Sequence, residues 1–214
     1  QLLPFAYALD NQVIGAAIHK VETEGKSVSC HKGCSACCRA QPVPVTPPEA
    51  HAIALFVDAL PEPRRMEIRN RFADGVARLK SKGLFELFLR ETEVTDKDQA
   101  RTIAGEYFQL GLVCPFLDDD ACSIHLARPF VCRQYLVTSP AELCTDPLTN
   151  KVDVVPIPVA PAKALLKAGE TVTGRPQLTV PLVLSLEYAG RHRDELERTG
   201  DSEQLLHQWL AALV

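Results

Sequence analysis

Eight cysteines constrain this 214-residue chain more than any other feature, because four of them fall within residues 30–38. Cys30, Cys34, Cys37 and Cys38 have the pattern C-x3-C-x2-C-C, and Gly33 between them allows a tight turn. Short spacings of this kind let several thiolates from one loop converge on a soft metal ion or an iron–sulfur cluster. The pattern therefore predicts a metal centre.

A second group of cysteines makes two sets of four. Its members are separated by 7, 9 and 11 residues: Cys114, Cys122, Cys132 and Cys144. Disulfides would suit the even count, but disulfide scaffolds are usually short and secreted. Buried free thiols usually occur singly. We therefore predict that all eight cysteines are metal ligands, with disulfides and free thiols as the alternatives.

The type of metal is less strongly indicated than its presence. A structural zinc site closes with four Cys or His ligands, commonly from paired C-x2-C knuckles, whereas only Cys34 and Cys37 form such a knuckle here. Adjacent side chains tend to point in different directions, so either Cys37 and Cys38 serve two centres or only one of them is a ligand. Cys114 precedes a proline, as does the cysteine that closes bacterial ferredoxin runs. We favour one or two iron–sulfur clusters, of the [4Fe–4S] type, over zinc.

Several polar residues near the cysteines are candidates for a role at this centre. Thiolates around a cluster leave negative charge that nearby cations stabilise. We predict that Arg128 and Arg133 bind a cofactor or the carboxylate of a substrate, with ion pairing inside the protein as the alternative. His31 and His125 are expected beside the centre or on the surface. The three consecutive aspartates at 118–120 diverge, which predicts a solvated turn and not a cation site.

Apolar residues recur at helical spacing along most of the chain. The predicted helices cover residues 5–24, 46–60, 68–79, 84–89, 95–111, 128–135, 160–168, 181–198 and 202–213. Thr46 and Glu49 form a capping box, and Thr95 is predicted to cap another helix. Residues 151–155 could form a short strand, confined to a sheet edge by Pro156 and Pro158.

We therefore expect a mainly α fold in which two cysteine-rich loops converge on the metal centre or centres, with at most one or two short strands. Residues 1–214 are predicted to form a single domain. Its cysteine-cluster core spans about residues 28–146, and a C-terminal helical extension spans about residues 159–214.

Charge and hydropathy narrow the classes of partner. The 23 Lys and Arg against 27 Asp and Glu give a net charge of −4 without a clustered basic patch, so we expect no nucleic-acid partner. No apolar run reaches the roughly 18 residues that a membrane helix needs, so we expect no membrane partner. The first ten residues lack the basic start of a signal peptide. These features favour a cytoplasmic protein.

The ordered cysteine motifs resemble those of the YkgJ-type cysteine-cluster family over roughly residues 28–146. After C-x3-C-x2-C-C come CPFL at 114–117, CSIH at 122–125 and RPFVCRQY at 128–135. His125 stands where the family commonly has tyrosine. The family is described as a zinc- or iron-chelating domain, which implies metal-ligand roles for the eight cysteines. The chain is also distantly similar to flagellin lysine N-methylases, which implies an iron–sulfur cluster used with S-adenosylmethionine, although we find no glycine-rich methyl-donor loop.

Three functional hypotheses follow from these residues. The favoured one is a metalloprotein with one or two iron–sulfur clusters that performs redox or Lewis-acid chemistry on a bound protein or small molecule. A structural zinc-binding adaptor is the second, in which metal binding contributes folding energy. The third is a metal-handling chaperone or sensor that transfers a soft ion through Cys37 and Cys38.

Overall fold

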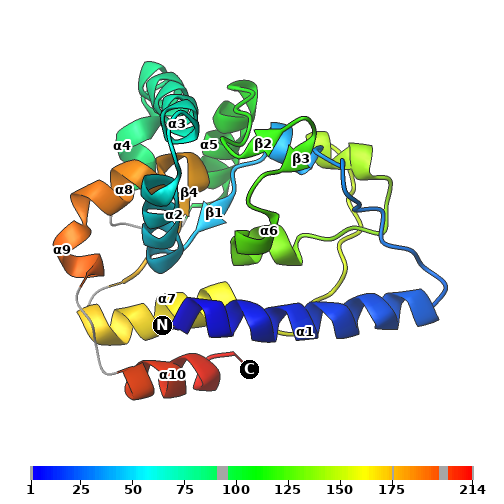
Figure 1. Cartoon of the computed structure of the whole chain (residues 1–214). Coiled ribbons are helices and arrows are strands. Elements are labelled where there is room, and N and C mark those ends of the chain that lie inside the picture. Colours follow the sequence, from blue (N-terminus) through cyan, green and yellow to red (C-terminus); the bar gives the residue numbers. More distant parts are fainter. Residues whose placement is uncertain (1, 91–95, 175, 198–201, 214) are drawn as a thin grey trace.

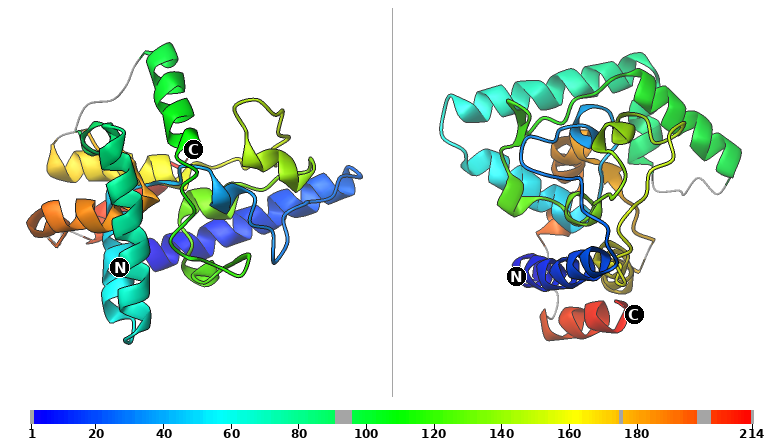
Figure 2. Two further views of the ribbon diagram at one scale, coloured as in Figure 1. Left: turned by 90° about the horizontal axis from the view of Figure 1, so that it is seen from above. Right: turned by 90° about the vertical axis from the view of Figure 1, so that its right-hand side faces the viewer.

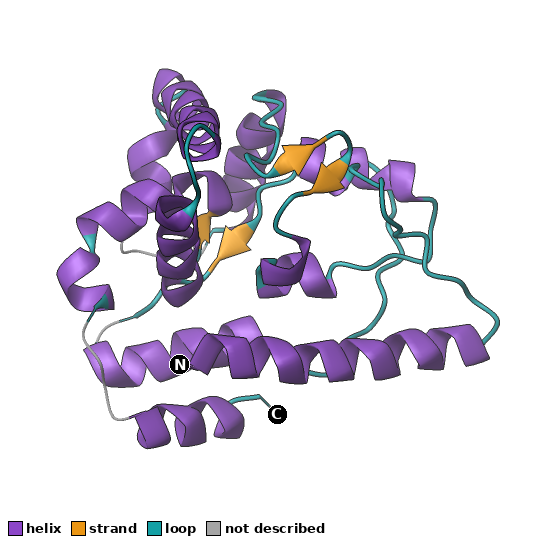
Figure 3. Ribbon diagram, viewed as in Figure 1, coloured by secondary structure: helices purple, strands orange, loops and turns teal. Residues whose placement is uncertain are grey.

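The computed structural model describes residues 2–90, 96–174, 176–197 and 202–213, and most of these residues are helical (Figures 1 and 3). The α-helices are α1 Leu2–Thr23, α2 Pro47–Ala59, α3 Arg64–Ser81, α4 Leu84–Leu89, α5 Lys97–Gln109, α6 Phe130–Gln134, α7 Pro161–Thr173, α8 Ser185–Arg191, α9 Arg193–Leu196 and α10 Ser202–Ala211. Short 3-10 helices are η1 Cys37–Arg39, η2 His125–Ala127, η3 Ala141–Thr145 and η4 Leu182–Leu184. The expectation of a mainly α fold is confirmed.

Local sequence signals explain where several helices begin. Thr46 and Glu49 form the predicted capping box at the start of α2, with proline in its first turn. Gly83 adopts a left-handed backbone conformation (φ 70°) that separates α3 from α4. Asp96 caps α5 by accepting hydrogen bonds from the backbone of Asp98 and Gln99. Thr95, the predicted cap, lies outside the described residues.

Two helices differ in extent from the prediction. The helix predicted at 160–168 continues to Thr173, where Gly174 ends it in a left-handed conformation. The helix predicted at 181–198 is divided into η4, α8 and α9, with His192 between α8 and α9.

The β-structure consists of two short antiparallel pairs within the described residues. β1 Pro44–Val45 pairs with β4 Val180–Pro181, and β2 Leu117–Asp118 pairs with β3 Ala121–Cys122. The strand predicted at 151–155 is wrong, because this segment forms only an isolated bridge between Val154 and Val137. The hydroxyl of Ser139 accepts the hydrogen bond of the Asp153 backbone N–H, which interrupts a regular ladder there.

The helices form two layers around separate apolar clusters. The larger cluster fills the space between α2, α3, α4 and residues 180–184, and Phe72 and Phe116 pack edge to face within it. Here α3 approaches η4 closely, since a Cβ added to Gly75 would lie 2.2 Å from Cγ2 of Val183. This close approach requires glycine.

The second layer contains α1, α7 and α10, which lie together along one side of the molecule (Figures 1 and 2). Trp209 of α10 is buried against this cluster, and its indole N–H donates to the carbonyl of Pro161 at 3.2 Å. α6 lies between the two layers and contacts α1, α7 and β1. Across the described residues, no helix combines the length and apolar character needed to cross a membrane.

Candidate metal centre

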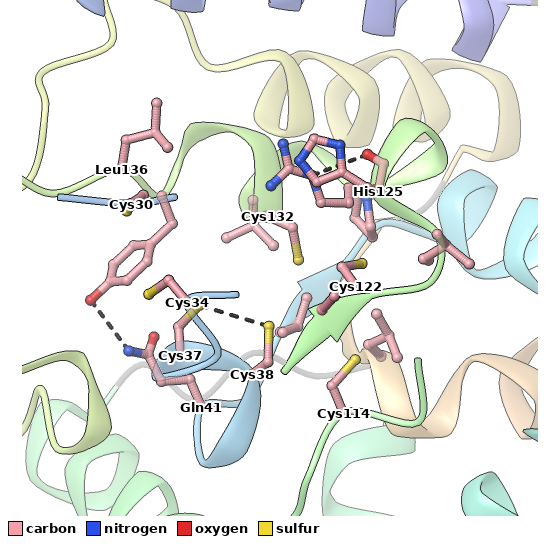
Figure 4. Close-up of a pocket in the computed structure, with 18 of the residues that line it drawn as sticks. Cys30, Cys34, Cys37, Cys38, Gln41, Cys114, Cys122, His125, Cys132 and Leu136 are labelled. Atoms are coloured by element: carbon pink, nitrogen blue, oxygen red, sulfur yellow. Dashed lines mark hydrogen bonds between the residues drawn. The ribbon is translucent and has the colours of Figure 1, made fainter. Parts of the chain in front are cut away.

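A cavity of about 430 Å³ lies where the two cysteine-bearing regions meet (Figure 4). Seven of the eight predicted ligands line it: Cys30, Cys34, Cys37, Cys38, Cys114, Cys122 and Cys132. The fold thus brings together two groups of cysteines that lie about 80 residues apart in the sequence. The structure brings together the two cysteine-rich loops as expected.

Different structural elements present these thiols. Cys37 and Cys38 lie in η1, Cys122 lies in β3 and Cys132 lies in α6. The backbone N–H of Cys114 donates to the carbonyl of Cys38 at 2.8 Å, which joins the first region directly to the second. The thiol sulfurs of Cys37 and Cys38 are 3.9 Å apart.

Two of the three aspartates at 118–120 anchor the turn between β2 and β3. Asp118 pairs with Arg64 and Arg71 of α3. Asp120 pairs with Arg39 and accepts a hydrogen bond from the hydroxyl of Ser35, which belongs to the first region. We call Ser35, Arg39 and Asp120 the loop latch. The carboxylates diverge, as predicted, but Asp118 and Asp120 are held by ion pairs and not merely solvated.

The position of α6, and so of Cys132, is set by α1 and α2. Oε1 of Glu49 accepts hydrogen bonds from the backbone of Phe130 at 2.7 Å and from the Tyr7 hydroxyl at 3.2 Å. From α1, Asp10 accepts a hydrogen bond of 2.7 Å from the side chain of Gln134. Glu49 is nearly fully buried, and the sequence analysis recognised only its capping role.

The two predicted cofactor-binding arginines occupy different places. Arg128 lines the cavity. The guanidinium of Arg133 is buried and donates to the carbonyls of Leu126 (2.5 Å) and Arg128 (2.6 Å) and to Asn11 (3.0 Å). It also lies 4.3 Å from the ring centre of Tyr7. Arg133 therefore positions the backbone of the segment that carries Arg128.

Cys144 is the one predicted ligand that does not line the cavity. It is buried in η3, and its backbone carbonyl is linked through Gln41 to Tyr135, which does line the cavity. Gln41 donates to the carbonyl of Cys144 at 2.7 Å and to the Tyr135 hydroxyl at 3.3 Å. The sequence analysis missed Gln41, for which the only signal is its place three residues after Cys38.

Burial raises the pKa of four cavity thiols, Cys30, Cys114, Cys122 and Cys132, and so favours their protonated form. It raises the pKa of Cys114 to about 12 and raises the pKa of Cys132 well above its ordinary value, and neighbouring thiols add to both shifts. The charge of Arg128 lowers the pKa values of Cys30 and Cys122 and so partly offsets the effect of burial. Because metal ligation requires thiolates, binding a cation here would release protons.

Two histidines complete the polar wall. His31 and His125 both line the cavity. Burial, Arg128 and Arg133 lower the pKa of His125, so that its imidazole is neutral at neutral pH and able to bind a metal. Nδ1 of His31 lies within hydrogen-bond distance of the carbonyl oxygen of Ser29, at 2.9 Å.

The donor chemistry fits a soft metal or an iron–sulfur cluster, because thiolate is the ligand that these centres prefer. Among the described residues, however, no three Cys, His, Asp or Glu side chains stand close enough together to hold one ion. Ligation by the cavity thiols therefore requires them to move toward one another.

Comparison with known proteins agrees with the cysteine pattern. The model of the CxxCxxCC family, described as "Putative zinc- or iron-chelating domain", matches residues 29–151. No curated protein and no solved structure matches the chain. The matched residues contain all eight cysteines and the whole of the loop latch.

Proposed function

The chain belongs to the CxxCxxCC family of zinc- or iron-chelating domains, and we propose that it holds an iron–sulfur cluster for redox or Lewis-acid chemistry on a bound partner. The observation that carries this proposal is the convergence of seven thiols on one cavity of about 430 Å³. An iron–sulfur cluster would supply one-electron transfer, or an open iron that polarises a bound group.

Two features support a cluster over a single zinc ion. The thiols outnumber the four ligands that close a structural zinc site. Arg128 and Lys32 in the cavity wall place positive charge where thiolate ligation of a cluster leaves negative charge.

We propose that the ligands come from the seven cavity cysteines. Cys144 has a different task, because it does not line the cavity and its carbonyl accepts a hydrogen bond from Gln41, which also donates to Tyr135 in the wall. The test is to purify the protein without oxygen and to measure iron, acid-labile sulfide and visible absorbance. We expect brown protein with equal iron and sulfide, as a [4Fe–4S] cluster requires.

Variants then locate the ligands. Cys34→Ala and Cys132→Ala should each lose iron and colour, whereas the matched control Cys144→Ala should retain both. Folded, colourless protein from iron-replete cells would refute the cluster. Equal iron loss in Cys144→Ala would return Cys144 to the ligand set.

Structural zinc is the second candidate, and the neutral His125, which lines the same cavity as Cys122 and Cys132, favours it by offering a mixed Cys/His set. Stoichiometric zinc without sulfide, together with unfolding on chelation, would select this candidate.

A further inference from the structure

The cavity has the size of a pocket for a small organic molecule. Its volume of about 430 Å³ falls within the roughly 300–1,000 Å³ typical of pockets for small organic molecules. Such pockets combine an apolar lining with a few polar groups that fix the orientation of the ligand. The walls of this cavity have both components.

Apart from the thiols, the charged side chains of the wall are mainly cationic. Among the described lining residues Asp120 is the one carboxylate, and the loop latch already pairs it with Arg39. Arg128 and Lys32 supply two cations. Nε of Arg128 donates to the carbonyl of His125 at 3.1 Å, and within the described residues its terminal Nη atoms bind no protein acceptor.

Arg128 is also held in place. The buried guanidinium of Arg133 donates to the carbonyl of Arg128 at 2.6 Å, and its other nitrogens bind Leu126 and Asn11. Of the two arginines, Arg128 therefore has the nitrogens available for a ligand, while Arg133 is a positioning residue.

An apolar wall completes the cavity. It is formed by Pro42, Val43, Ile124, Val131, Leu136 and Leu182. The backbone N–H of Leu182 donates to the carbonyl of Val43 at 2.7 Å, and that of Val155 donates to the carbonyl of Leu136 at 2.8 Å. These bonds fix the wall from two distant parts of the chain.

We propose that this cavity binds a small organic carboxylate, with its carboxylate on the free face of the Arg128 guanidinium and its apolar chain against Val43 and Leu182. The inference rests on the proposed function in that the bound carboxylate lies beside the thiol-ligated metal and is the partner on which that metal acts. An arginine fork matches a carboxylate in two parallel hydrogen bonds, which explains the choice of a carboxylate.

The experiment is a calorimetric titration of the protein as purified, and of the chelated protein, with butanoate, pentanoate and hexanoate. Each added methylene should tighten binding about fourfold, the equivalent of about 0.8 kcal/mol of buried CH₂. Hexanamide, which has the same chain without the charge, should bind at least about tenfold more weakly than hexanoate.

Variants test the role of Arg128. Arg128→Gln should weaken hexanoate binding about tenfold or more, and Arg128→Lys should weaken it less because it keeps the charge but loses the fork. Arg65→Gln is the matched control, because Arg65 is a partly exposed arginine that pairs with Glu62 and does not line the cavity. It should bind hexanoate like the unchanged protein.

Metal content, measured on the same samples, separates the possible outcomes. Unchanged hexanoate affinity in Arg128→Gln overturns the proposal, and a changed metal content or reduction potential in that variant would then assign Arg128 to offsetting thiolate charge. A protein without metal would refute the proposed function. In that case the ratio of the hexanoate affinities of the unchanged protein and of Arg128→Gln still decides whether the anion site exists.

Discussion

The carboxylate of Glu49 accepts a hydrogen bond of 2.7 Å from the backbone N–H of Phe130, which opens the helix that carries Cys132. The same side chain accepts from Tyr7 and, through its other oxygen, from the backbone and hydroxyl of Thr46 at 2.9 and 2.8 Å. One buried carboxylate thus joins α1, α2 and α6, and through α6 it reaches the cavity.

Glu49→Gln should destabilise the protein, because its amide nitrogen would face donors where an oxygen now accepts. Hydrogen bonds to a charged group contribute about 1.5–3 kcal/mol each, so we expect the free energy of unfolding to fall by about 2 kcal/mol or more. Urea titration of the chelated protein measures this fall. Glu106→Gln, on the exposed face of α5, is the matched control, and an equal effect of both changes would contradict the role of Glu49.

Asp10 makes stability depend on pH. Burial, opposed by Gln134 and Arg133 and assisted by Glu49, raises the pKa of Asp10 above its ordinary value, and its Oδ2 is buried without a hydrogen-bond partner. A raised pKa in the folded state means that the folded protein holds this proton more tightly than the unfolded chain. The contribution of Asp10 to stability is therefore present at low pH and is lost as pH rises through the folded-state pKa.

Asp10→Asn should remove this loss. The stability of the variant relative to the unchanged protein should increase between pH 4 and pH 8, by about 1.4 kcal/mol for every unit of upward displacement of the pKa. Urea titrations across this pH range measure the difference. A constant difference at all pH values would show that Asp10 ionises normally.

Asp120→Asn should loosen the loop latch. The change removes the charge that pairs with Arg39 and weakens the hydrogen bond from Ser35. Because the pair is half exposed, we expect a stability change below about 1 kcal/mol, but faster exchange of bound metal against a chelator. Asp119→Asn is the matched control, since Asp119 is exposed and asparagine also tolerates its left-handed backbone (φ 44°). Equal exchange rates in both variants would exclude a latch.

Gly75→Ala should destabilise the contact between α3 and η4. The added methyl group would overlap Cγ2 of Val183, and overpacking of this kind costs about 1–3 kcal/mol. Gly105→Ala, in α5, meets no atom within 4 Å and should instead stabilise the protein by up to about 1 kcal/mol. Thermal unfolding of both variants gives the comparison, and two changes of the same sign would contradict this account of the packing.

The helices were predictable because the signals that start and end them lie within a few consecutive residues. The capping box of Thr46 and Glu49 spans three residues and is present as expected. The strand pairs were not predictable, because each strand has two residues and β1 finds its partner β4 more than 130 residues away. A two-residue strand carries no periodic pattern. The strand predicted at 151–155 failed for the related reason that Ser139, not a neighbouring strand, takes the Asp153 N–H.

The site could be predicted in its chemistry but only partly in its arrangement. Thiol spacing indicated a metal centre, and the fold gathers seven of the eight cysteines around one cavity. Which arginine faces that cavity depends on α1, where Asn11 and Tyr7 engage Arg133 and leave Arg128 at the wall. No local pattern encodes a contact between residues more than 120 positions apart.

The pairing of Leu182 with Val43 also has a consequence for the nascent chain. During translation the first four cysteines leave the ribosome long before Leu182, and every cysteine precedes it. The wall that shelters the thiols is therefore completed only after Leu182 has been made. Until then this wall does not cover the thiols, so they are more open to oxidants and to competing ions than they are in the folded chain.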